Sequence, residues 1–192
     1  MDIHFATSNA RKVRSLQKDL AQYGFNVVHH PVDLIEPRAS DIQEIARVKM
    51  LQAYPQIEAP TIVIDAGFFV HSIRGFPRAY VNFALETVDL EGILRLVDGK
   101  DRACEFRECL AYQAPGMSEP HYVSATIPGT VAPKELGFTR PRSWSRLDLI
   151  FIPDGSDLTL AQMEDDQYQE WRKEARKDNS LGYQLSQYLD ST

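Results

Sequence analysis

The chain has 192 residues, of which 43% are hydrophobic and 25% charged, proportions typical of a globular protein with a sizeable apolar core. Its formal net charge of −6 argues against a nucleic-acid polymer as partner, because such a polymer needs a broad positive field. No apolar run approaches the roughly 20 residues that span a bilayer, so we expect one domain over residues 1–192 and no membrane partner.

The first third of the chain alternates strand and helix patterns. Gly24 is a fitting stop for the first helix, and the pattern S-x-x-Q from Ser40 predicts a capped start for the second. Gly67 is expected to end the strand that follows. The expected elements are a strand at 2–7, a helix at 10–23, a strand at 26–30, a helix from 40 to about 54 and a strand at 61–65.

The rest of the chain adds longer strands and further helices. Such a mixture, with helices at both ends and a strand pair in the middle, predicts an α/β domain with a mixed sheet. The expected elements are a loop at 75–78, a helix at 90–97, strands at 103–113 and 120–131, a basic loop at 138–146, a strand at 147–153 and mostly helix over 160–190.

The two cysteines give no sign of a disulfide or a zinc site. Cys104 and Cys109 are five residues apart in an expected strand, so their side chains should face opposite sides. Residues 1–6 are strand-like and include an acidic residue, unlike a signal peptide. We therefore expect a cytoplasmic protein.

Polar groups gather where the first strand turns into the first helix. Thr7, Asn9 and Lys12 supply a hydroxyl, an amide and an ammonium at a helix amino end, where phosphate groups are often bound. The alternative is that Ser8 or Asn9 simply caps the helix and that Lys12 is an exposed lysine.

Two acidic residues follow on later elements. Asp65 ends the apolar run that begins at Thr61, a position where open α/β sheets often carry metal ligands and bases. Its alternative is a turn aspartate that caps the next loop. Glu44 lies beside the apolar face of its expected helix, and by itself it reads as a surface residue near a helix start.

A basic loop over residues 139–146 precedes Asp148. Its arginines suit phosphate, and Trp144 offers a face on which a base can stack. A solvated loop anchored by Trp144 is the alternative. Asp148 has apolar neighbours and needs a partner if buried, for which a salt bridge to Arg146 or Arg142 is the plain alternative to a functional role.

Five motifs, in order along the chain, resemble those of the inosine/xanthosine triphosphate pyrophosphatase (ITPase-like) family. The opening A-T-S-N-A-R-K-V-R-S-L is similar to the family pattern A-T-G-N-x-x-K-x-x-E-[LV]. V-I-D-A-G-F is similar to the strand that carries the family's catalytic carboxylate. The other three are E-I-A-R-V-K at 44–49, G-F-P-R-A-Y at 75–80, and P-D-G with L-A-Q-M within 153–163.

The resemblance implies an elongated mixed β-sheet in two α/β lobes with a central nucleotide cleft, usually in a homodimer. It also implies hydrolysis of a nucleoside triphosphate to a monophosphate and pyrophosphate with Mg²⁺ as cofactor. From the motifs and the resemblance together, we assign Asp65 and Lys12 to catalysis, Glu44 and Asp65 to the metal, and Thr7, Ser8, Asn9, Lys12, Lys49, Trp144, Ser145, Asp148 and Ser180 to the substrate. Whether Ser180, Asn179, Gln184 or Trp144 contacts the base is left open.

Several positions depart from the family pattern. The Ser-His-Arg that reads a 6-oxo purine is replaced by Asp178-Asn179-Ser180-Leu181-Gly182, which predicts an altered base preference. The alternatives are a catalytically weakened homologue that binds or senses a nucleotide, and a partner-binding protein with a dimer surface that includes Tyr80, Val81 and Phe83. The other departures are Ser8, Ser15, Ile64 and Ser145.

Overall fold

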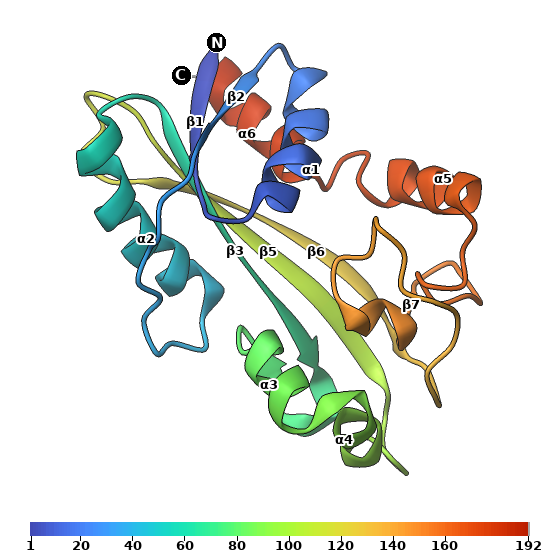
Figure 1. Cartoon of the computed structure of the whole chain (residues 1–192). Coiled ribbons are helices and arrows are strands. Elements are labelled where there is room, and N and C mark those ends of the chain that lie inside the picture. Colours follow the sequence, from blue (N-terminus) through green and yellow to red (C-terminus); the bar gives the residue numbers. More distant parts are fainter. Residues whose placement is uncertain (192) are drawn as a thin grey trace. The chain divides into compact units, whose positions relative to one another are not determined.

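The computed structural model describes residues 1–191. Their strands form one mixed sheet (Figure 1). The order is β2 (Asn26–His30), β1 (Asp2–Ala6), β3 (Thr61–Val70), β5 (Ala103–Gln113), β6 (His121–Val131) and β7 (Phe151–Pro153), and β4 (Pro77–Arg78) pairs with β3. Since β1 runs parallel to β2 and β3 while β3–β4 and β6–β7 are antiparallel, the predicted mixed α/β architecture is confirmed.

Six α-helices accompany the sheet within residues 1–191. Among these residues, no helix is both long and apolar enough to cross a membrane. The helices are α1 (Ala10–Ala21), α2 (Ile42–Ile57), α3 (Val81–Thr87), α4 (Asp89–Leu96), α5 (Asp165–Ala175) and α6 (Leu181–Asp190), with short 3-10 helices η1 (His71–Ile73) and η2 (Arg146–Leu149).

Contacts divide the chain into two compact units. Unit 1 consists of Met1–Ala66, Glu108–Ala125 and the described residues from Lys177 onward. Unit 2 consists of Gly67–Arg107 and Thr126–Arg176. The strands β3, β5 and β6 contribute residues to both units, and each unit has an apolar cluster of its own.

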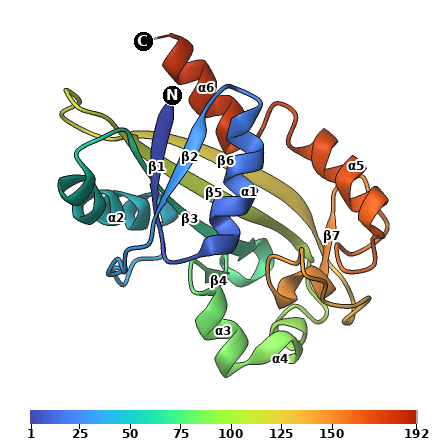
Figure 2. The same cartoon turned by 45° about the horizontal axis from the view of Figure 1, so that its top comes forward.

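In unit 1, α1 and α6 lie side by side, as both cartoon views show (Figures 1 and 2). Gly182 at the start of α6 donates its N–H to Asp19 Oδ2 of α1 at 2.9 Å. A Cβ at Gly182 would lie 2.8 Å from the Asp19 carboxylate, so the two helices approach closely because this residue is a glycine. The cluster beneath them includes Ile3, Phe5, Leu16, Leu20, Ile62, Ile64, Leu181 and Leu185.

Along β3, neighbouring side chains point to opposite faces of the sheet, and this places Ile64 and Asp65 in different surroundings. Ile64 accordingly lies in the apolar cluster with α1 and α6, whereas Asp65 is hydrogen-bonded to Lys49 of α2. An acidic residue in place of Ile64 would therefore face the apolar core of unit 1.

Unit 2 is built around packed aromatic rings. The ring centroids of Phe68 and Phe106 are 4.8 Å apart, and the Phe151 ring lies edge-on to both, at 6.0 and 4.8 Å. Leu90 and Ile93 of α4 are fully buried in the same cluster. Burial of several aromatic rings supplies a large apolar area for so small a unit.

Several expected boundaries were wrong, three of them with consequences for packing. Gly67 does not end β3: a Cβ there would lie 2.7 Å from Arg78 O, so the glycine instead allows β4 to approach β3. The cap of α2 is Asp41, which accepts from Gln43 N at 2.9 Å, and not Ser40. The expected strand at 147–153 begins as η2 and is extended only from Phe151.

The helical pattern also differed from the expectation in two places. The expected helix over 160–190 is divided into α5, which ends at Ala175, and α6, which begins after the cap at Ser180. The helix α3, which has seven residues and a single buried one, Ala84, was not expected. So short an element carries too little apolar periodicity to be recognised.

Candidate functional site

A buried lysine in unit 1 contacts two carboxylates. Lys49 Nζ lies 2.8 Å from Asp65 Oδ1 and 2.6 Å from Glu36 Oε1. Lys49 and Asp65 are only 7% and 6% exposed, whereas the Glu36 side chain is 62% exposed. Because a buried charge is costly without a partner, the ion pair is what allows both side chains to remain inside.

The sequence of α2 determines where Lys49 points. The buried residues of this helix recur at intervals of three and four, which is the spacing of one helical face. Lys49 belongs to that buried face, although it is charged. It is therefore directed toward β3, where Asp65 follows four buried residues of the strand. The buried face of α2 is formed by Ile42, Ile45, Ala46, Lys49, Met50 and Ala53.

The Asp65 carboxylate is only partly satisfied. Its Oδ2 atom is buried and has no hydrogen-bond partner among residues 1–191. Burial raises the pKa of Asp65 above its ordinary value, although the Lys49 ammonium opposes this rise. Burial alone would lower the pKa of Lys49, but the carboxylates of Asp65 and Glu36 outweigh it and raise that pKa. One oxygen of Asp65 is thus buried without a hydrogen-bond partner in the described part of the chain.

Lys12 belongs to the same electrostatic neighbourhood. Burial and the nearby Lys49 ammonium lower its pKa, while Asp65, Glu108 and Glu36 act in the opposite direction. Lys12 and Asp65 were both predicted as catalytic residues, and the structure brings their charges within mutual influence.

The turn before α1 is held by side-chain hydrogen bonds. Thr7 Oγ1 accepts from Asn9 N at 3.1 Å, and Asn9 Oδ1 accepts from Lys12 N at 3.3 Å. Ser8 lies exposed in the bend between them. Both the predicted phosphate turn and the alternative helix cap are compatible with this geometry, because Asn9 acts as a cap while Lys12 remains close to the acidic groups.

Glu44 lies apart from these contacts. Its carboxylate accepts two hydrogen bonds from Arg47, each at 2.8 Å, and both side chains are half-exposed. This hydrogen-bonded pair lowers the pKa of Glu44. To reach a metal ion near Asp65, Glu44 would have to release Arg47.

Glu36 is the site residue that sequence reasoning missed. It lies in an irregular stretch between β2 and α2, where no periodicity indicates which side chains turn inward. Its contact with Lys49 depends on how that stretch folds back over α2. Two nearby contacts hold the stretch: Ile35 N donates to Gln52 Oε1 at 2.9 Å, and Gln52 Nε2 donates to Ile35 O at 2.8 Å.

The expected base-binding residues of the basic loop lie in unit 2. Asp148 is 1% exposed, and its Oδ2 atom accepts from Trp144 N at 3.1 Å. Burial raises its pKa to about 6. Ser145 Oγ accepts from Leu147 N at 3.0 Å and caps η2. The Trp144 ring packs edge-on against Phe106, with centroids 5.4 Å apart.

The arginines of that loop form structural contacts. Arg142 Nε is 2.9 Å from Asp165 Oδ1, and its guanidinium lies over the Tyr168 ring. Arg146 pairs with Asp89 at 2.8 Å. The alternative of a salt bridge from Arg142 or Arg146 to Asp148 was therefore wrong, because both arginines pair with other aspartates.

Ser180 has a structural role in unit 1. It is 1% exposed and its Oγ accepts from Tyr183 N at 3.0 Å, which caps α6. Ser180 was predicted to contact substrate, and its position gives it little freedom to do so.

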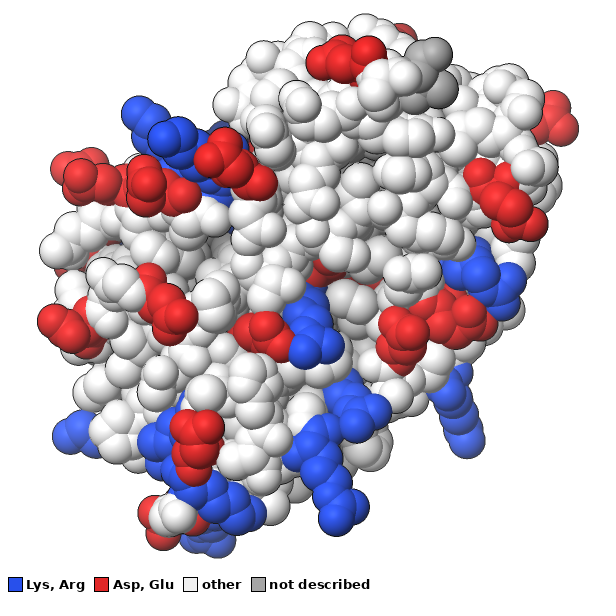
Figure 3. Space-filling model, turned by 180° about the vertical axis from the view of Figure 1, so that it is seen from behind, with Lys and Arg blue, Asp and Glu red and all other residues white. Residues whose placement is uncertain are grey.

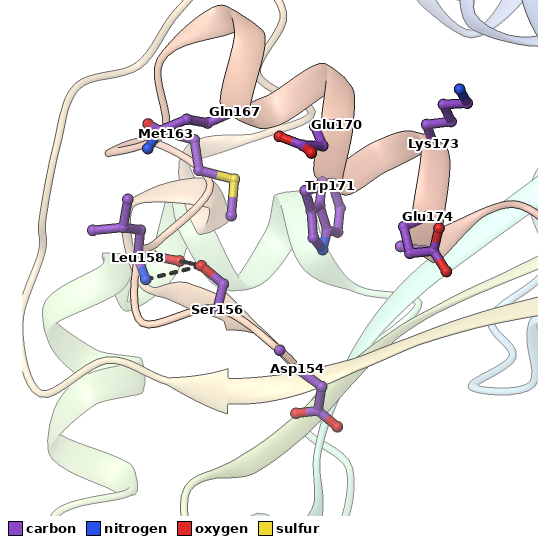
Figure 4. Close-up of a pocket in the computed structure, with 11 residues that line it drawn as sticks. Asp154, Ser156, Leu158, Met163, Gln167, Glu170, Trp171, Lys173 and Glu174 are labelled. Carbon is purple, nitrogen blue, oxygen red and sulfur yellow. Dashed lines mark hydrogen bonds between the residues drawn. The ribbon is translucent and has the colours of Figure 1, made fainter.

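A separate depression of about 630 Å³ lies in unit 2, between α5 and the turn after β7 (Figure 4). Trp171 and Met163 point toward it, and carboxylates of Glu170 and Glu174 lie at its rim. None of the residues predicted for catalysis, metal or substrate lines it. Across the face in Figure 3, acidic and basic side chains lie next to each other, as suits a chain with a modest net charge.

Comparisons with known proteins agree with the fold. A model of the Ham1 family matches residues 3–177. The chain belongs to the Ham1 family.

Curated Ham1 relatives cover nearly the whole chain. The dITP/XTP pyrophosphatase of Hyperthermus butylicus is 29% identical, over 97% of this chain and 95% of that protein. The dITP/XTP pyrophosphatase of Methanopyrus kandleri is 32% identical, over 85% of each. The expected family is therefore confirmed.

Solved Ham1 structures share the architecture. A HAM1 protein from Coxiella burnetii has a TM-score of 0.82 at 20% identity, over 100% of both chains. The Staphylococcus aureus Ham1 protein has a TM-score of 0.78 at 22% identity, over 100% of this chain and 99% of that one. These two likenesses support the fold alone.

Proposed function

We propose that this Ham1 protein hydrolyses a nucleoside triphosphate to a monophosphate and pyrophosphate, with Mg²⁺ as cofactor, at the Lys12–Lys49–Asp65 site. The buried Lys49–Asp65 pair, with its unsatisfied Asp65 oxygen, carries the proposal. A buried carboxylate of raised pKa with a free oxygen is expected at a reaction centre rather than in a packed core.

The chain's acidic groups fit a magnesium ion that is held jointly with substrate. Among residues 1–191, no cluster of three or more acidic, histidine or cysteine side chains could hold a metal alone. Magnesium commonly takes one or two carboxylates together with substrate phosphates and water. Asp65 Oδ2 and the exposed carboxylate of Glu36 are two donors that could serve in this arrangement. When bound, the ion would neutralise phosphate charge.

Further residues of unit 1 would bind the phosphates and activate the attacking water. The amino end of α1 with Thr7, Ser8 and Asn9 offers N–H and hydroxyl groups to phosphate oxygens. Lys12 donates to the same anion. Lys49 keeps Asp65 oriented and ionised, so that Asp65 can orient a water molecule and accept its proton. The water oxygen then bonds to the α-phosphorus as the bond to the bridging oxygen breaks.

We also propose that the base preference differs from that of the dITP/XTP pyrophosphatases named above. The segment in place of Ser-His-Arg begins α6, and Ser180 is occupied as its cap. A site that lacks donors to a base edge loses discrimination for that base. Trp144 and Asp148 remain candidates for substrate contact, and a homodimer is expected from the family resemblance.

The test is a panel of ribo- and deoxyribonucleoside triphosphates, including dITP and XTP, assayed for pyrophosphate release with and without Mg²⁺. We expect hydrolysis of at least one triphosphate and a fall of about 100-fold or more in kcat for Asp65→Asn. Asp154→Asn, which alters an exposed carboxylate of unit 2, is the control. No release from any triphosphate, or full activity in Asp65→Asn, would reject the proposal.

A second candidate is a homologue that binds a nucleotide without rapid turnover. It is favoured by Ile64, since the structure buries this side chain in the apolar cluster where no carboxylate can be supplied to the metal. The two functions differ in outcome: a binder shows ligand-dependent thermal stabilisation with no pyrophosphate.

A further inference from the structure

A histidine of β2 is hydrogen-bonded to the turn that precedes α1. Thr7 N donates to His30 O at 3.0 Å, and His29 Nε2 lies 2.9 Å from Thr7 O. The regular pairing of β1 with β2 ends one residue earlier, where Ala6 is opposite His30. The His29 side chain therefore extends the connection between the strands to Thr7.

The direction of this contact is fixed by its chemistry. The Thr7 carbonyl oxygen can only accept, so His29 Nε2 carries the proton and donates. Both the neutral tautomer protonated at Nε2 and the imidazolium carry the proton that this hydrogen bond needs. Leucine has no donor, whereas the amide nitrogen of glutamine does.

The contact is the first of a series that leads to Lys12. His29 holds the Thr7 carbonyl, Thr7 Oγ1 accepts from Asn9 N, and Asn9 Oδ1 accepts from Lys12 N. These bonds fix the orientation of the peptide groups in the turn. A phosphate that binds there requires several N–H groups to point at it together, which makes the turn's orientation important for affinity.

We propose that His29 is a positioning residue that orients the phosphate-binding turn through the Thr7 carbonyl. It acts through Thr7 and is not itself in contact with the reacting atoms. The proposal rests on the proposed function, because it assumes that the turn binds phosphate.

The test compares His29→Leu with His29→Gln. His29 is exposed, so neither change creates a cavity in the core. His71→Leu is the matched control, because His71 is an exposed histidine whose partner, Glu105, lies in unit 2. We expect His29→Leu to raise KM for the preferred triphosphate about fivefold with less change in kcat, and His29→Gln to restore most of it.

A second readout does not depend on hydrolysis. Inorganic tripolyphosphate should raise the thermal midpoint of the wild type, His29→Gln and His71→Leu, and raise that of His29→Leu less at the same concentration. If tripolyphosphate stabilises the protein but no nucleoside triphosphate is hydrolysed, the proposed hydrolase is rejected. In that case a smaller stabilisation of His29→Leu than of the wild type would still support the role of His29. The proposal is overturned if His29→Leu matches the wild type in both KM and tripolyphosphate response, if His29→Gln is as impaired as His29→Leu, or if tripolyphosphate binds no variant.

Discussion

Lys49 of α2 and Asp65 of β3 form an ion pair of 2.8 Å in which both side chains are almost fully buried. Replacement of one partner leaves the other charge buried without compensation, which is far more costly than the net contribution of the intact pair. A substitution that removes either charge of the candidate site should therefore also lower the stability of unit 1.

Lys49→Met should lower the free energy of unfolding by about 3 kcal/mol, measured by urea denaturation. Arg47→Met, which removes a half-exposed partner of Glu44, should change it by less than about 0.5 kcal/mol. Adding Asp65→Asn to Lys49→Met should recover part of the loss, since the buried charge disappears. A loss in Lys49→Met no larger than in Arg47→Met would contradict this account.

Glu36 and Glu44 can be distinguished by magnesium titration. Glu36 contacts the Lys49 ammonium, whereas Glu44 is held by Arg47. We expect Glu36→Gln to raise the Mg²⁺ concentration for half-maximal activity about tenfold, and Glu44→Gln to change it about twofold or less. The reverse order would return the metal-binding role to Glu44.

Asp148 should make stability depend on pH in mildly acidic solution. Its pKa rises from 3.8 when exposed to about 6 in the folded protein. Between these values the folded state binds more protons than the unfolded state, so stability falls as pH rises through this window. The change contributed by Asp148 should be on the order of 3 kcal/mol. Urea denaturation at pH 4 and pH 7 should show this dependence reduced in Asp148→Asn, and an unchanged dependence would refute it.

Gly67→Ala should destabilise the protein by about 2 kcal/mol, because the new methyl would lie 2.7 Å from Arg78 O and 2.8 Å from the Phe69 ring. The measurement is the urea midpoint at constant denaturant slope. A variant as stable as the wild type would show that β4 can move away from β3 at little cost.

The parts of the site that could be predicted are those with a local pattern. Asp65 follows an apolar strand, and Lys12 follows a polar turn at a helix start, so both could be identified from neighbouring residues. Lys49 breaks the apolar face of α2 with a charge, which is also visible in the sequence.

The parts that could not be predicted depend on contacts between distant residues. Glu36 comes from an irregular stretch, and its partner is thirteen positions away on α2. Ser180 looked available for a base, but it is almost fully buried and its hydroxyl caps α6. The role of Gly67 follows from Arg78, which comes close only after the chain has turned through η1.

The groups that influence Lys12 have a consequence for how substrate arrives. Two lysines, at 12 and 49, are accompanied by three acids, at 36, 65 and 108, so this neighbourhood is formally anionic before any ligand enters. A bare polyphosphate would meet repulsion there. A divalent counterion carried with the polyphosphate would lower its negative charge and so reduce this repulsion, and under the proposed function we therefore expect the metal complex to bind more readily than the free nucleotide.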